Sequence, residues 1–171
     1  MTTEMNKEHE LEVVNVRLVR SQSLYSEERI TSPTTAVNVI AEELCSYDRE
    51  VFCVLNLNTQ NKVINMNIVS MGTIEACQVH PREVFKTSIL SNAAHIMAIH
   101  NHPSGSITPS RDDIETTKRL YDGGMLLGIP LLDHIIVGGD TGNYYSFRGS
   151  ELMEEIEREF KAREEEEEYG Y

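Results

Sequence analysis

The sequence predicts one domain of the mixed α/β class, and three observations support this prediction. Segments whose apolar residues recur every three or four positions alternate with short runs of β-branched and apolar residues, so helical and strand patterns are interleaved along the chain. The chain has 171 residues, a length that usually holds a single core and leaves no room for a second catalytic domain. Because 40% of its residues are hydrophobic, it is too apolar to be disordered throughout.

The chain begins with a mixed, polar leader over residues 1–31, in which the alternating stretch 11–19 suggests an edge strand. The pattern becomes helical at Pro33. Apolar residues then recur at helical spacing as far as Leu44, and polar residues near Asp48 end the predicted helix.

A β-hairpin is predicted next, because two β-branched runs at 51–57 and 63–69 flank a polar, turn-forming segment. A short strand is expected at 74–79. Pro81 is tolerated in the first turn of a helix, and the apolar residues after it recur on one helical face until the pattern stops near Asn92.

Residues 95–100 form a short apolar run that predicts a buried strand, and residues 101–109 form a loop dense in Pro, Gly and Ser. Ser110 begins another helix. We expect this helix to close at Gly123 and Gly124, because glycine commonly follows the last helical residue.

Two more strands are predicted at 131–137 and 144–147, which completes a domain over residues 32–150. Residues 151–171 carry ten Glu and three basic residues, so −7 of the net charge of −13 lies in this segment. We expect it to begin as a helix with an apolar stripe at Leu152, Ile156 and Phe160, and to end as a solvated, like-charge tail at Glu164–Glu168.

The composition limits the partners and the compartment of the protein. With 28 acidic and 15 basic residues, the chain lacks the excess of Lys and Arg that drives binding to phosphate backbones, so direct nucleic-acid binding is not expected. No apolar run approaches the roughly 20 residues that span a bilayer, and no signal pattern is present, so a cytoplasmic protein is expected. Cys45, Cys53 and Cys77 lack metal-binding spacing and predict reduced thiols. The oligomeric state stays open.

A histidine pair and a carboxylate carry the clearest chemical signal. His100 and His102 lie two residues apart at the end of an extended run, so their side chains point to the same face. Pro103 turns the chain away, and the helix that follows can bring Asp113 back toward both histidines. Two His and one carboxylate form the ligand pattern of catalytic zinc, which leaves a fourth position for water.

Some of these residues also have purely structural interpretations. Ser110 and Asp113 fit a helix-capping pattern, which is compatible with metal binding by Asp113, and both interpretations stay open. His134 lies in an apolar strand and is interpreted as a satisfied core histidine, and His80 and His95 are interpreted as structural in the same way.

The stretch His100-Asn-His-Pro-Ser-Gly105, followed by Pro109-Ser110 and Asp113, resembles the JAMM metal motif of JAB/MPN domains, in the form found in bacterial RadC-like proteins. Further RadC-like stretches are Arg49-Glu-Val-Phe52, Val79-His-Pro-Arg-Glu-Val-Phe85, Leu132-Asp-His-Ile-Ile-Val137 and Tyr145-Ser-Phe147. The resemblance covers about residues 32–148. It implies a JAB/MPN fold, a cytidine-deaminase-like sheet flanked by helices, with one zinc ion held by His100, His102 and Asp113.

In the wider family the activity is metal-dependent hydrolysis of amides, so the resemblance implies a zinc metallopeptidase-like hydrolase with an unknown peptide or protein substrate. The family's upstream Glu matches Glu50, which would move a proton from water to the leaving amine. Glu75 and Glu83 are rivals by sequence alone. In similar proteins the motif Ser donates to the developing oxyanion, a role that falls here to Ser110.

Longer RadC-like proteins carry an N-terminal helix-hairpin-helix region, whose tight turns need glycine. No glycine precedes Gly72, so the chain resembles a short form without that region. The alternative function is a non-catalytic or accessory RadC-like protein linked to DNA repair or mobile elements, and a fourth protein ligand would favour it. A zinc nucleobase deaminase is set aside because its His-x-Glu and Pro-Cys-x-x-Cys segments are absent from the sequence. A nuclease of the His-Asn-His type is also set aside, because nothing basic surrounds these residues.

Overall fold

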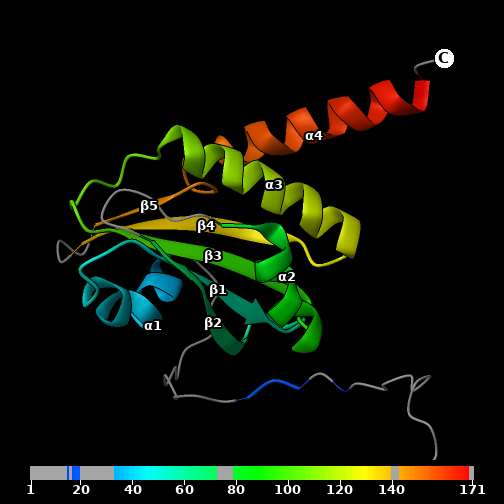
Figure 1. The fold of residues 1–171 in the computed structure, drawn as a ribbon. Helices are drawn as coiled ribbons and strands as arrows, with labels where there is room; N and C mark the ends of the chain where they lie inside the picture. Colours follow the sequence, from blue (N-terminus) through cyan, green and yellow to red (C-terminus); the bar gives the residue numbers. More distant parts are fainter. Residues whose placement is uncertain (1–14, 16, 20–32, 73–78, 140–142, 170–171) are drawn as a thin grey trace, which may run out of the picture.

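The computed structural model describes residues 15, 17–19, 33–72, 79–139 and 143–169, and these ranges contain four helices and five strands (Figure 1). The helices are α1 (Pro33–Cys45), α2 (Pro81–Leu90), α3 (Arg111–Leu127) and α4 (Leu152–Tyr169). The strands are β1 (Val51–Leu57), β2 (Val63–Met71), β3 (His95–His102), β4 (Leu131–Gly138) and β5 (Tyr144–Ser146).

The strands form one mixed sheet in the order β2-β1-β3-β4-β5. The pair β3 and β4 is parallel, and the other neighbouring pairs are antiparallel. A parallel pair needs a crossover connection, because the chain must return to the end of the sheet where the first strand began. Helix α3 supplies this crossover, so it directly follows β3 along the chain and precedes β4.

Helices cover both faces of the sheet (Figure 1). Helix α1 packs on the face to which Val51, Cys53 and Leu55 of β1 point, and α2, α3 and α4 pack on the face of Phe52 and Val54. All seven residues of β1 are buried, because each face of this strand is covered. The predicted mixed α/β class is confirmed.

The predicted end of α3 at Gly123 and Gly124 is wrong. The helix continues to Leu127, and Gly128 ends it in the left-handed conformation with φ +68°. Gly124 lies inside the helix, where an added Cβ would be only 2.7 Å from the carbonyl oxygen of Ile129. This glycine therefore serves the close packing of α3 against the chain that leads into β4.

The helical part of the acidic segment is longer than predicted, because α4 continues through Glu164–Glu168 to Tyr169, whereas residues 164–167 are exposed, as expected of a solvated, like-charge block. The predicted stripe of Leu152, Ile156 and Phe160 packs against the core together with the buried Met153. Glu is a good helix former, so a helix that is held by its packed half extends into solvent through its acidic half.

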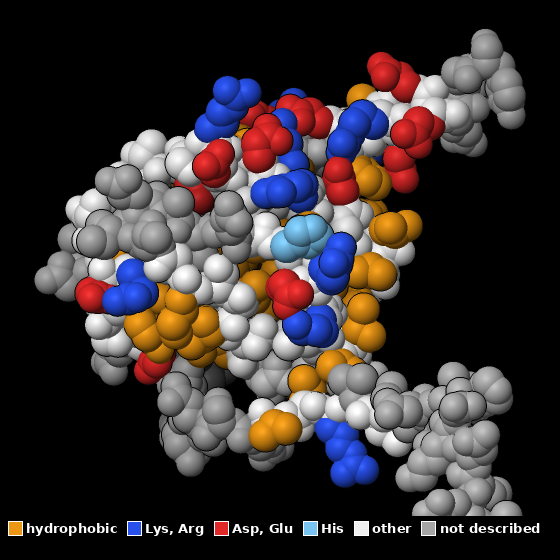
Figure 2. Space-filling view, viewed as in Figure 1, with side chains coloured by type: hydrophobic (Ala, Val, Ile, Leu, Met, Phe, Trp, Pro, Cys, Tyr) orange, Lys and Arg blue, Asp and Glu red, His pale blue; other side chains and the backbone are white. Residues whose placement is uncertain are grey.

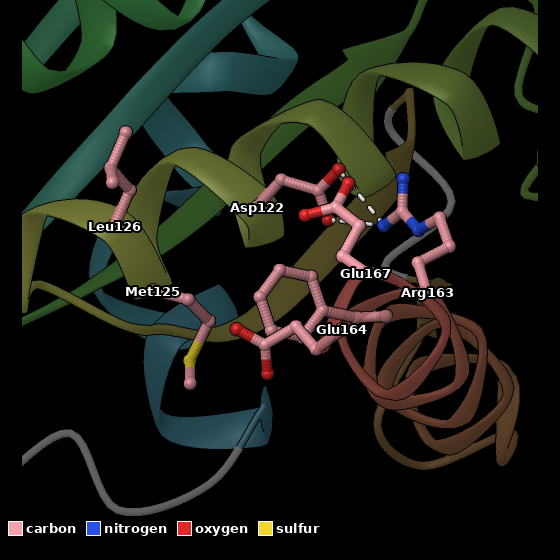
Figure 3. A pocket seen from close by; sticks show the side chains of 7 residues that line it. Asp122, Met125, Leu126, Arg163, Glu164 and Glu167 are labelled. Carbon is pink, nitrogen blue, oxygen red and sulfur yellow. Dashed lines mark hydrogen bonds and ion pairs between the residues drawn. The ribbon is translucent and has the colours of Figure 1, made fainter. Parts of the chain in front are cut away.

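Charged side chains are interspersed over α3 and α4 in the space-filling view (Figure 2), and some of them join the two helices. Lys118 Nζ of α3 lies 2.6 Å from Glu159 Oε2 of α4. Arg163 of α4 lies 2.7 Å from Asp122 of α3, and dashed lines mark this ion pair in Figure 3. A groove of about 370 Å³ separates the helices at this point, lined in part by Met125.

Parts of the sequence prediction fall on residues outside the described ranges. Of the stretch 11–19, residues 15 and 17–19 are described and lie outside any strand. The short strand predicted at 74–79 lies outside the described residues except for Val79, which is not in a strand. Within the described ranges, no helix combines the length and the apolar character that crossing a membrane requires.

Candidate metal centre

Three side chains meet where β3 ends and α3 begins. His100 and His102 belong to β3, and Asp113 is the third residue of α3. One potential ligand atom from each of them lies within 4.8 Å of the other two. His100 Nε2 is 3.2 Å from one carboxylate oxygen of Asp113, and His102 Nε2 is 3.6 Å from the other. His100 is 1% exposed and Asp113 is 8% exposed, so the group is largely removed from water.

Hydrogen bonds orient His102 toward this group. Its Nδ1 lies 2.9 Å from the carbonyl oxygen of Ser106, which can only accept a hydrogen bond. In the neutral imidazole, Nδ1 therefore carries the proton, and Nε2 keeps a lone pair directed at His100 and Asp113. Asp113 raises the pKa of His102, chiefly through a hydrogen bond, so a proton and a metal ion compete for the same nitrogen.

Asp113 takes part in the N-terminal cap of α3 and also belongs to the group of candidate metal ligands. Ser110 is the N-cap of α3, and its Oγ and backbone N each lie 2.7 Å from Asp113 Oδ2, while Asp113 N donates back to Ser110 Oγ. Burial acts to raise the pKa of Asp113, but contacts with His100 and His102 and the bond from Ser110 hold this pKa well below its usual range. Asp113 is thus a carboxylate, the form that binds cations.

The capping pattern read from the sequence is present, and it engages the hydroxyl of Ser110. This hydroxyl donates its single proton to Asp113 Oδ2. A role for Ser110 as an oxyanion donor therefore requires the hydroxyl to exchange Asp113 for the substrate.

Glu50 lies directly before β1 and is half-buried. Its pKa is raised, chiefly by burial, and it also interacts electrostatically with His100, Asp113 and His102. It is not among the three grouped ligand residues. Among its rivals by sequence, Glu83 is exposed and paired with Lys86 on α2.

The other rival, Glu75, lies outside the described residues. Of the two candidates that the structure describes, Glu50 is the one whose pKa reflects the charges of the grouped residues.

Asn101, between the two histidines, holds the backbone on both sides of Glu50. Its Oδ1 accepts from Val51 N at 2.8 Å, and its Nδ2 donates to the carbonyl oxygen of Arg49 at 3.1 Å. Local sequence patterns did not predict this role of Asn101. Alternation along a strand shows that Asn101 points away from the histidines, but it does not show which segment it meets there.

His134 is fully buried, and both of its ring nitrogens have partners, as expected of a satisfied core histidine. One of these partners is His100, whose Nδ1 lies 2.9 Å from His134 Nε2. This contact was not predicted from the sequence, because it depends on the parallel pairing of β3 with β4.

The other two histidines considered have no part in the group. His80 is exposed and caps the N-terminus of α2 by accepting from Arg82 N. His95 begins β3, at the opposite end of the strand from His102.

The fold and the site together define a class of protein, a JAB/MPN-type domain with a candidate metal centre of two His and one Asp. A family model described as the RadC-like JAB domain matches residues 30–152, and the chain therefore belongs to this family.

Relatives of the chain carry the family name UPF0758. A UPF0758 protein of Caldanaerobacter subterraneus is 45% identical over 124 residues, which cover 69% of this chain and 53% of the relative. One from Clostridium acetobutylicum is 46% identical, over 73% of this chain and 54% of the relative. The UPF0758 protein YsxA of Bacillus subtilis is 46% identical, over 70% of this chain and 52% of the relative. The chain thus spans about half the length of the curated relatives it matches.

Proposed function

We propose that this chain is a zinc-dependent hydrolase that cleaves a peptide or isopeptide amide in an unknown peptide or protein substrate. The observation that carries the proposal is the convergence of His100, His102 and Asp113, whose ligand atoms lie within 4.8 Å of one another. Two imidazole nitrogens and a carboxylate suit zinc in charge and in ligand type. Within the described residues the group has three members, and three protein ligands are the number that catalytic zinc uses.

Bound zinc would act as a Lewis acid and would lower the pKa of a water molecule at its open position to about 7. Glu50 would accept a proton from the attacking water as the water oxygen forms its bond to the amide carbon. The same carboxyl then donates the proton to the amine nitrogen as the C–N bond breaks. Its raised pKa supports this role, because the carboxyl must hold the proton between the two steps. Ser110 donates to the carbonyl oxygen, on which negative charge develops.

The test measures metal content first and hydrolysis second. Purified chain, reconstituted with zinc and dialysed, is expected to retain one zinc per chain and to cleave a mixed-sequence, fluorescence-quenched peptide library or a Gly–Lys isopeptide probe. His102→Ala should lose both properties. His80→Asn is the matched control, because it changes an exposed histidine and keeps a side chain that can cap α2.

Failure to retain zinc after reconstitution would sink the proposal. If the protein retains zinc but cleaves no probe, and if its Glu50→Gln variant behaves in the same way, the non-catalytic, accessory alternative is favoured.

A further inference from the structure

A chain of buried hydrogen bonds links two of the candidate ligands through β4. Thr117 Oγ1 lies 2.6 Å from the backbone carbonyl oxygen of Asp113 and 2.6 Å from Nδ1 of His134. His134 Nε2 in turn lies 2.9 Å from Nδ1 of His100. Thr117 and His134 are 0% exposed and His100 is 1% exposed, so water does not compete for these bonds.

The direction of each bond follows from the number of protons available. The carbonyl of Asp113 can only accept, so the single hydroxyl proton of Thr117 points to it. Thr117 Oγ1 must then accept from His134, which places the proton of that ring on Nδ1. The fully buried His134 ring has a hydroxyl and another imidazole as its hydrogen-bond partners and no carboxylate among them, so it is neutral, and its unprotonated Nε2 accepts from His100 Nδ1.

This direction decides which nitrogen of His100 can bind a metal ion. A ligating imidazole is neutral and carries one proton, which the bond to His134 places on Nδ1. Nε2 of His100 therefore keeps its lone pair, 3.0 Å from Nε2 of His102 and 3.2 Å from the Asp113 carboxylate. Three electron-rich atoms then converge, an arrangement that a cation stabilises.

Aromatic side chains hold the His134 ring in the orientation that this chain of bonds needs. The ring stacks on Phe147, with centroids 4.9 Å apart and planes 18° apart, and Phe52 contacts it edge-on at 5.3 Å. Tilting the ring out of this plane would break both hydrogen bonds and disturb both aromatic contacts.

We propose that Thr117 and His134 are positioning residues that select the Nδ1–H tautomer of His100 and so prepare its Nε2 for a metal ion before the ion binds. This inference rests on the proposed function, because it assumes that His100 ligates a metal. Partners of ligating histidines typically change metal affinity by 10- to 100-fold when they are removed.

The first test uses the metal-free wild-type protein and needs no variant. Long-range proton–nitrogen NMR spectra of protein labelled with ¹⁵N-histidine distinguish the two imidazole tautomers. We expect the Nδ1–H tautomer at His100, His102 and His134. The Nε2–H tautomer at His100 or at His134 would overturn the inference.

The second test removes the acceptor at the start of the chain. Thr117→Val keeps the shape of the side chain but not its oxygen, so the tautomers of His134 and His100 should change, and zinc affinity should fall by about 10- to 100-fold in a chelator competition. Thr117→Ser should restore both properties. Thr87→Val on α2 is the matched control, since Thr87 also donates to a helical carbonyl, that of Val84, and is not in the chain of bonds.

An unchanged tautomer or an unchanged zinc affinity in folded Thr117→Val would overturn the inference. The two proposals can fail separately. If the tautomers and the zinc affinity respond as expected but no amide probe is cleaved, the hydrolase proposal fails and the positioning role stands.

Discussion

At the scale of single residues, the candidate centre depends on side chains that satisfy two requirements at once. Asp113 uses Oδ2 to accept the capping bonds of Ser110, while Oδ1 faces His100. Because the two tasks fall mainly on different oxygens, the first turn of α3 stays capped while a carboxylate oxygen remains directed at the histidines. Asn101 similarly lies between two candidate ligands and holds the backbone around Glu50.

The role proposed for Glu50 predicts a separation of metal binding from catalysis. Glu50→Gln should keep zinc, because Glu50 is outside the grouped ligands, while the hydrolysis rate should fall by about 10²-fold or more. Zinc per chain and initial rates on the cleaved probe check this. Glu83→Gln serves as the control and should retain activity, since Glu83 is exposed and paired with Lys86. Full activity of Glu50→Gln would exclude Glu50 as the general base.

The two bonds made by Asn101 predict a loss of stability when its side chain is removed. Asn101→Ala leaves the amide of Val51 and the carbonyl of Arg49 without this partner, so the free energy of unfolding should fall by about 1–3 kcal/mol. Urea unfolding measures the difference. Asn38→Ala, on the exposed side of α1, should change the midpoint little. Equal midpoints for the two variants would show that the Asn101 bonds contribute nothing measurable.

At the scale of elements, the β3–α3–β4 crossover assembles the centre. Strand β3 presents His100 and His102 on one face, and α3 returns with Asp113 in its first turn. The parallel pairing with β4 then places His134 on the same face of the sheet, beside His100. The position of Asp113 relative to the two histidines therefore depends on the packing of α3 against the sheet.

The packing of α3 predicts an unusual effect of alanine in a helix. Gly→Ala inside a helix normally stabilises it by up to about 1 kcal/mol. Gly124→Ala should instead lower the free energy of unfolding by about 1–3 kcal/mol, because the new Cβ would meet the Ile129 carbonyl oxygen at 2.7 Å. Gly123→Ala should cost less, since its Cβ meets a ring carbon of Phe85 at 3.0 Å. A more stable Gly124→Ala protein would contradict this account of the packing.

At the scale of the whole molecule, helices on both faces bury the central strands β1, β3 and β4, and α4 adds charge outside this core. Its packed half contributes Met153 and Ile156, which are 0% and 1% exposed. Its acidic half at 164–167 is exposed and contributes to a net charge of −13. The ion pairs with α3 are solvent-exposed and contribute little individually, so the packed half holds the helix in place.

The charge of the whole chain predicts weak binding to nucleic acid. Without an excess of Lys and Arg, few counterions are released from phosphates, and a 20-base-pair duplex should show no binding at protein concentrations up to about 10⁻⁶ M near 0.15 M salt. Fluorescence anisotropy of a labelled duplex measures this. Binding that persists at this salt concentration would show that local structure overrides the net charge, and it would revive a DNA-related role.

The sequence by itself determined the order of the elements, the candidate ligands and the family resemblance. Strand alternation places His100 and His102 on one face, and the cap of α3 follows from Ser110 and Asp113 only three positions apart. Such features are local, so periodicity and short spacing are enough to predict them.

Only the tertiary structure decided which residues support the candidate ligands and where α3 and α4 end. Asn101 meets a backbone segment about 50 positions away, and His134 meets His100 because β4 pairs with β3. Gly123 and Gly124 of α3 fit the pattern of a helix end, and only the close contact of Gly124 with the Ile129 carbonyl oxygen explains a glycine inside the helix. The acidic block of α4 is helical because the preceding turns of that helix are packed against the core. These outcomes depend on contacts between segments far apart in the sequence, and local patterns do not encode which segments will meet.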